Sequence, residues 1–228
     1  LSSFSVFTAS VAFSAAMTIC KNFYQVLTCL LASFGGLYAA YLSGGRGSWV
    51  AIPVITLLLV WLLRDRINIK QTILAFTAFT VLLISIISIN PEIITKRIGM
   101  AITEIQLYQK DPSIHTSVGA RFNMWDNSIQ IWSSHPFFGT GLGDFKQDNN
   151  QILEQKYGSE YNSRFTEPHS IYFDALAMTG IVGLIALLWA VLYYPFKIFY
   201  HYWKTADDDL DKFYALSGIM IITVFAVA

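Results

Sequence analysis

The chain has 228 residues, of which 54% are hydrophobic and 13% are charged, and its formal net charge at pH 7 is zero. Soluble domains carry about 25% charged residues, so the composition excludes an ordinary soluble domain. The balanced charge gives no sign of a nucleic-acid partner. Long stretches hold no charge, as lipid requires, because a Lys, Arg or Asp at the bilayer centre costs roughly 2.5–3.5 kcal/mol. The sequence therefore predicts a membrane protein.

Apolar segments long enough for helical spans, which need roughly 17–25 residues, occur at both ends of the chain. They cover residues 4–20, 23–42, 48–63, 72–89, 171–199 and a stretch starting at 213. We expect about four spans in residues 1–89. In residues 169–228 we expect one full span, a cytoplasmic hinge in the acidic stretch 207–211, and one truncated span. The fold class is thus an all-α polytopic helical bundle, and the chain is expected to be a fragment of a longer one.

The direction of the spans follows from basic residues, which gather in short cytoplasmic loops. One such loop, residues 63–71, holds Arg64, Arg66 and Lys70. The segment after the fifth span holds Lys197, Lys204 and Lys212. Alternation then places the short turn 43–47 and the large loop 90–168 outside the cytoplasm.

The large loop, residues 90–168, is too charged to cross a membrane, and its patterning predicts helices. Residues 91–110 repeat apolar side chains at helical spacing among charges. Residues 121–134 do so again, with Phe122, Trp125, Ile129 and Trp132 on one side. Aromatic residues favour the headgroup layer. This second helix is therefore expected either to lie on the membrane or to pack on its neighbours. A glycine-rich turn, 135–145, and a polar helix around 151–157 follow.

Two external arginines are candidates for anion binding. Arg46 lies in the turn Ser-Gly-Gly-Arg-Gly-Ser-Trp at 43–49, where glycines let backbone N–H groups approach a phosphate and a helix N-terminus adds positive potential. Its guanidinium can bind an anion bidentately, or it can simply extend into solvent. Arg121 opens the second predicted loop helix, and it too is either solvated or functional.

His169 lies where the chain returns to the membrane, after Pro168 and before an apolar helix. An unperturbed imidazole can take a proton from a hydroxyl group near neutral pH, which is general-base work. The alternative is an interfacial histidine that only forms hydrogen bonds. Both cysteines, Cys20 and Cys29, lie in or beside apolar segments, so no thiolate metal site is predicted. The combination of external arginines and histidine suits a lipid-linked diphosphate donor and a hydroxyl acceptor.

Four short motifs follow one another along the chain. The turn at 43–49 is similar to a Ser-Arg-Gly-x-Trp motif, and Arg121 with Trp125 is similar to an R-x3-L element with Trp in place of Leu. Residues 135–145 contain P-x-x-G-x-G. His169-Ser170, nine residues and Gly180-x-x-Gly183 fit H-[NSQ]-x9-G-x-x-G, although Leu184 departs from the usual next residue. Small residues at this spacing also let helices pack closely. Together the motifs resemble the O-antigen ligase and polymerase superfamily of bacterial membrane glycosyltransferases, closest to the lipopolysaccharide O-antigen ligases.

This resemblance implies an inverting, metal-independent glycosyltransferase of the bacterial inner membrane, with its active side in the periplasm and no cofactor. It would move O-antigen glycan from undecaprenyl diphosphate to the lipid A–core of lipopolysaccharide. Its partners would be the lipid-linked glycan, the lipid A–core acceptor and the bilayer. Arg46 and Arg121 would bind the diphosphate and stabilise the leaving-group charge, while His169 would act as base on the acceptor hydroxyl or orient it.

Other functions stay open. An O-antigen polymerase or a protein O-oligosaccharyltransferase would share this architecture and differ in acceptor. A transporter or flippase without covalent chemistry is the alternative from another class. Transporters tend to carry charged or broken helices near the bilayer midplane, whereas the spans here lack charged residues at mid-depth.

Overall fold

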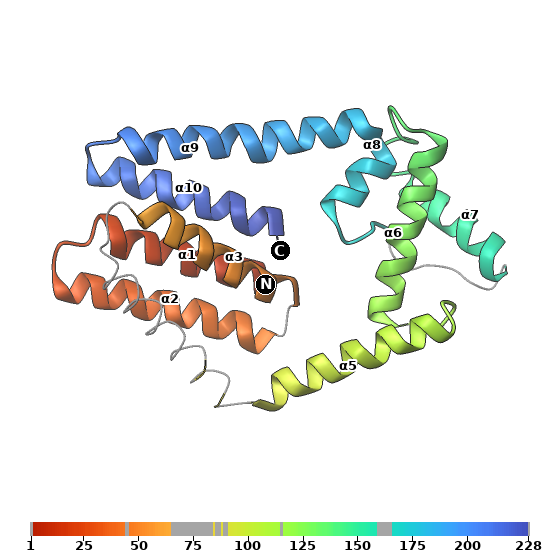
Figure 1. Ribbon diagram of the computed structural model, residues 1–228, viewed down its shortest axis with the longest axis horizontal. Coiled ribbons are helices and arrows are strands. Elements are labelled where there is room, and N and C mark those ends of the chain that lie inside the picture. The colour runs from red at the N-terminus through yellow and green to blue at the C-terminus, as the bar shows by residue number, and fades with distance from the viewer. Residues whose placement is uncertain are drawn as a thin grey trace. The chain divides into compact units, whose positions relative to one another are not determined.

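The computed structural model describes residues 2–43, 46–64, 84, 88, 91–114, 116–158 and 166–227. In these ranges the regular structure is helical and no strand occurs, which confirms the expected all-α class (Figure 1). The expected span 72–89 lies outside the described residues apart from Ile84 and Ser88. The chain divides into two compact units, residues 1–95 with 192–228 and residues 96–191.

The first unit is a bundle of apolar helices. Its members are α1 (Ser2–Thr18), α2 (Phe23–Ser43), α3 (Arg46–Leu63), α9 (Tyr194–Thr205) and α10 (Asp209–Val227). Leu216, Ile219 and Met220 of α10 are fully buried in its core. Gly36 of α2 lies so close to α1 that an added Cβ would be 2.9 Å from the Ala9 Cβ. Small residues at helix contacts are a packing device of membrane bundles.

Three helical runs among the described residues are long and apolar enough to cross a membrane, Phe23–Ser43, Ile171–Thr205 and Asp209–Val227. Ser3–Thr18 and Trp49–Leu63 are shorter apolar helices. The prediction that the last span starts at 213 was wrong, because α10 already begins at Asp209. The Asp208 carboxylate accepts a hydrogen bond of 3.0 Å from the Leu210 N–H, and acidic residues are stabilising in a first helical turn. Part of the acidic stretch, from Asp209 onward, therefore forms the first turn of α10.

Arg64 and Lys204, one residue from each predicted basic segment, lie at the same end of the first unit. The Trp203 indole of α9 donates to the carbonyl of Leu62 of α3 at 3.4 Å, and the rings of Trp61 and Tyr200 stack at 5.2 Å. The Arg64 guanidinium lies over the Trp61 ring, and the Lys204 ammonium lies over Tyr200. Since α3 runs from Arg46 to Leu63, Arg46 begins the helix at the opposite end of the bundle.

The second unit contains most of α5 (Pro91–Lys110), α6 (Ser117–Ser134), α7 (Phe145–Tyr157) and α8 (Ile171–Leu187). A π-helical segment, η1 (Leu188–Tyr193), continues α8 into α9. Met124 and Ile131 of α6 pack with Phe145 of α7 and Ala177 of α8 in a small core. The helix predicted at 91–110 is confirmed with the same bounds.

The helix predicted at 121–134 begins earlier than expected. Thr116 caps it by accepting a hydrogen bond of 2.9 Å from the Gly119 N–H, so the helix starts at Ser117 and Arg121 lies in its second turn. A threonine hydroxyl satisfies one of the free N–H groups of a first turn, which explains the earlier start. The prediction that Arg121 opens the helix was therefore wrong.

Candidate functional site

Trp125 ties α6 to the segment that precedes α8. Its indole nitrogen donates a hydrogen bond of 3.0 Å to the carbonyl oxygen of Pro168. Its ring stacks on Phe173 of α8 at 5.3 Å, with an angle of 15° between the rings, and contacts Phe122 edge to face. Phe122 in turn meets Tyr108 of α5. Of the two alternatives for this helix face, packing on neighbours therefore holds for Phe122 and Trp125.

His169 has an unusual backbone conformation. Its φ is +52°, the one positive value among the described residues other than glycine. Residues other than glycine seldom adopt this region, although histidine does so more often than most, and such a conformation costs about 1–3 kcal/mol and gathers at functional sites. The preceding Pro168 is buried and bonded to Trp125, whereas the His169 side chain is exposed. The segment is held in place and presents the histidine at the surface of the second unit.

Arg121 lies one helical turn before Trp125 on the same face of α6, because residues four apart are neighbours on a helix surface. Its side chain is half-buried. Within the described part of the chain, no hydrogen bond or ion pair involves the guanidinium, so its donors are available to an anion. Trp125 thus brings Arg121 and the His169 segment into one neighbourhood of the second unit.

The helix after His169 is broken at Gly180, where φ is +65° and ψ is −164°. The predicted span 171–199 lies within a run that is long and apolar enough to cross a membrane, and this run extends to Thr205. The backbone groups freed by the break bond to the loop between α6 and α7. Thr140 and Gly141 donate to the carbonyls of Ala177 and Met178, at 3.2 and 3.1 Å. The N–H groups of Ile181 and Val182 donate to the carbonyls of Pro136 and Phe137, at 2.9 and 3.2 Å.

The hydrogen bonds between residues 136–141 and residues 177–182 form an interlock that depends on two glycines. A Cβ at Gly180 would clash with the backbone of Phe137, and a Cβ at Gly139 would clash with the backbone of Met178. Both glycines also have positive φ, which L-residues with a side chain rarely adopt. Gly180 therefore serves the loop contact and not only the helix packing that its spacing suggested. The P-x-x-G-x-G segment thus joins the two halves of α8 through backbone hydrogen bonds.

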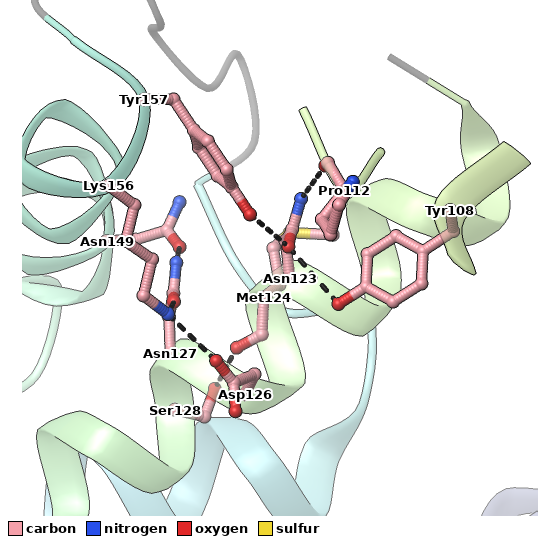
Figure 2. Close-up of polar contacts among 10 residues, drawn as sticks. All are labelled: Tyr108, Pro112, Asn123, Met124, Asp126, Asn127, Ser128, Asn149, Lys156 and Tyr157. Atoms are coloured by element: carbon pink, nitrogen blue, oxygen red, sulfur yellow. Dashed lines mark hydrogen bonds and ion pairs between the residues drawn. The ribbon is translucent and has the colours of Figure 1, made fainter. Parts of the chain in front are cut away.

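A ladder of polar contacts, buried at one end and exposed at the other, holds α6 to α7 (Figure 2). The Asn127 amide donates to the Asn149 oxygen of α7 at 2.9 Å, and the Lys156 ammonium donates to the Asn127 oxygen at 2.8 Å. Lys156 also pairs with Asp126 at 2.8 Å. Asn127 and Asn149 are completely buried.

A second group of polar contacts lies one turn earlier on α6. The side-chain oxygen of Asn123 accepts bonds of 3.3 Å from the hydroxyls of Tyr108 and Tyr157, and its amide donates to the Pro112 carbonyl at 2.9 Å (Figure 2). Hydrogen-bonded networks around a buried residue such as Asn123 rigidify a core. They fix the helix that carries Arg121 and Trp125.

The comparisons with known proteins decide the family. A family model described as O-antigen ligase matches residues 31–188, which is more than half of the chain. The chain belongs to the O-antigen ligase family. In this O-antigen ligase family member the matched region includes Arg46, Arg121 and His169, together with both arms of the Gly139–Gly180 interlock.

A relative from Haemophilus influenzae, described as an uncharacterized protein, is 28% identical over 188 residues. The match covers 82% of this chain and 47% of the relative, so the chain spans about half the length of the curated relative it matches. The family is that of membrane enzymes of the O-antigen ligase and polymerase type, and the apolar helices agree with a location in a membrane.

The sequence predicted Arg46, Arg121 and His169 as site residues, and the structure places them in two different units. Arg121 and His169 belong to the second unit, while Arg46 begins α3 in the first. Trp125 was noted only as part of a motif and an aromatic face, and its bond to Pro168 was missed. The signal for the interlock was an isolated glycine within an apolar helical run at 180, which costs about 1 kcal/mol relative to alanine and so points to a structural reason for it.

Proposed function

We propose that the protein transfers O-antigen glycan from undecaprenyl diphosphate to a hydroxyl of the lipid A–core. The observation that supports this most is the Trp125–Pro168 hydrogen bond, because it fixes the strained His169 segment beside the helix that carries Arg121. A cation with available donors and an exposed imidazole are the two groups that such a transfer needs. The reaction would take place on the periplasmic face of the bacterial inner membrane.

The chemistry assigns one role to each residue. The acceptor oxygen attacks the anomeric carbon while the bond from that carbon to the diphosphate oxygen breaks, so the configuration inverts and the diphosphate leaves with the bonding electrons. Arg121, joined by Arg46, would bind the diphosphate and stabilise its growing negative charge. His169 would take the proton of the acceptor hydroxyl, or orient that hydroxyl for attack. No step calls for a metal.

The acceptor separates this proposal from its relatives. A polymerase would pass the glycan to another lipid-linked unit, and a protein oligosaccharyltransferase would pass it to Ser or Thr. The lipopolysaccharide of a deletion strain distinguishes the first two. Loss of all O-antigen from the core indicates a ligase, whereas a single capped repeat indicates a polymerase.

A transporter without covalent chemistry has one feature in its favour, the broken helix α8. In transporters, the ends of broken helices are left open to bind substrates and ions. At Gly180 the freed N–H and carbonyl groups of residues 177–182 are instead bonded to residues 136–141 of the same chain. The break is filled by protein, which favours a structural joint over an ion site.

Complementation of a deletion strain tests the proposed residues. Arg121→Ala and His169→Ala, expressed at the level of the parent, are expected to lower O-antigen attachment by on the order of 10²-fold, the scale of one catalytic proton-transfer or charge-stabilising group. Lys146→Ala is the matched control, since Lys146 is an exposed cation of α7 in the same unit. Normal attachment in both variants would refute the assignment.

A further inference from the structure

The loop between α6 and α7 exposes an unusual amount of apolar surface. Phe137, Phe138 and Leu142 have 66, 77 and 82% of their surface exposed. Residues 135–143 contain no Asp, Glu, Lys or Arg, and the first charged residue after them is Asp144. Contiguous exposed apolar side chains of this size mark a binding surface.

The same loop is bonded through its backbone to a membrane-crossing helix. Phe137 accepts from the Val182 N–H, and its neighbour Pro136 accepts from the Ile181 N–H. The Pro136 carbonyl also accepts a bond of 3.0 Å from the Trp132 indole. These contacts hold the apolar tip against α8 at the level of the break at Gly180.

The break falls near the start of the apolar run. The last charged residue before it is Asp174, and the next charged residue after it is Lys197. The helical stretch after the break, residues 181–196, is about 24 Å long at about 1.5 Å per residue, most of the roughly 30 Å of a bilayer's hydrocarbon core. The break and the loop bonded to it therefore lie near one end of the span, in the layer where amphipathic segments insert their apolar side chains.

The helix itself presents exposed apolar side chains just beyond the break. Val182 and Ile185 are half exposed, and they follow directly on the residues that bind the loop. The apolar tip therefore continues the exposed apolar surface of the span. Aromatic side chains are favoured in this layer of the bilayer.

We infer that residues 137–142 form an interfacial anchor, in which Phe137, Phe138 and Leu142 insert into the lipid leaflet that borders the start of α8. The partner is the bilayer itself. This anchor rests on the membrane span and not on the proposed transfer reaction. It would fix the depth at which the loop holds the two halves of α8.

Spin labelling of the full chain in nanodiscs tests the anchor. In a background with Cys20→Ser and Cys29→Ser, single cysteines are introduced as Phe138→Cys, Leu142→Cys and, as control, Gln151→Cys on the exposed side of α7. The measured quantity is the ratio of collision rates of the label with oxygen, which concentrates in lipid, and with a water-soluble nickel chelate. The anchor predicts a ratio above one at 138 and 142 and below one at 151.

Two results would overturn the anchor. A nickel collision rate at 138 and 142 equal to that at 151 means that the tip lies in water. Protection from both reagents means that a protein surface covers the tip instead of lipid. Circular dichroism and size-exclusion profiles identical to those of the parent establish that each labelled chain is folded, and the two sites give independent readings.

Discussion

The indole nitrogen of Trp125 lies 3.0 Å from the carbonyl oxygen of Pro168, and this bond joins α6 to the residue just before His169. Stacking of the same ring on Phe173 adds a second contact on the far side of the histidine. Trp125 therefore contacts the chain both before and after His169. A residue with positive φ needs such support, because the local backbone preference opposes its conformation.

Trp125→Phe is expected to lower glycan transfer about tenfold while expression stays normal. Phenylalanine keeps the stacking on Phe173 but removes the donor to Pro168, and small displacements of a reacting group cost up to 10²-fold in rate. The rate of transfer by the purified chain measures the effect.

Trp132→Phe is the control, because it removes an indole bond of the same length, 3.0 Å, to a carbonyl that keeps the Ile181 donor. Transfer in this control should stay within about twofold of the parent, a factor that corresponds to only a few tenths of a kcal/mol. Equal losses in both variants would show that Trp125 has no special role in positioning.

Gly180→Ala is expected to destabilise the chain by about 3 kcal/mol or more. Alanine would have to adopt a conformation that is almost confined to glycine, costing about 1–3 kcal/mol, and its Cβ would also press on the backbone of Phe137. Thermal unfolding in detergent measures the loss. Gly139→Ala should act in the same way, because it meets Met178 from the other side of the interlock.

Gly99→Ala is the matched control for these glycines. Gly99 lies within α5, and nothing stands within 4 Å of an added Cβ. Alanine in a helix interior is more stable than glycine by about 0.8–1.0 kcal/mol, so this variant should unfold at the same or a higher temperature. If Gly180→Ala unfolds like Gly99→Ala, the interlock does not exist as described.

Asn127→Ala is expected to cost about 1–3 kcal/mol of stability, the penalty for leaving buried polar partners unsatisfied. Asn127 is completely buried, and its removal takes the donor from Asn149 and an acceptor from Lys156. Chemical unfolding followed by tryptophan fluorescence measures the loss. Gln130→Ala, an exposed position on the same helix, should be neutral, and a similar cost at both positions would contradict the ladder.

Much of the fold was predictable because apolar length and charge alone fix membrane helices. The bounds of the helix at 91–110 and the location of Arg64 and Lys204 at one end of the first unit follow from such patterns. The start of α6 was misplaced because Thr116, outside the apolar repeat, provides the cap. The start of α10 was misplaced because charged residues were assigned to a hinge, although carboxylates stabilise a first helical turn.

The site was predictable only in its polar members. Arg121 and His169 stand out because charged and titratable residues at a membrane edge suggest function. Trp125 and the Gly139–Gly180 pair act through contacts between segments distant in sequence, and periodicity within one segment carries no information about such contacts. The positive φ of His169 is maintained by these tertiary contacts, so no local sequence pattern predicts it.

Transfer by the purified full chain tests the central claim most directly. Lipid-linked glycan is offered with lipid A–core, with a second lipid-linked unit and with a Ser/Thr peptide in turn, and the parent is compared with Arg121→Lys and His169→Gln. We predict transfer to lipid A–core alone, reduced by on the order of 10²-fold in both variants. Transfer to either other acceptor, or full activity in the variants, would contradict the account.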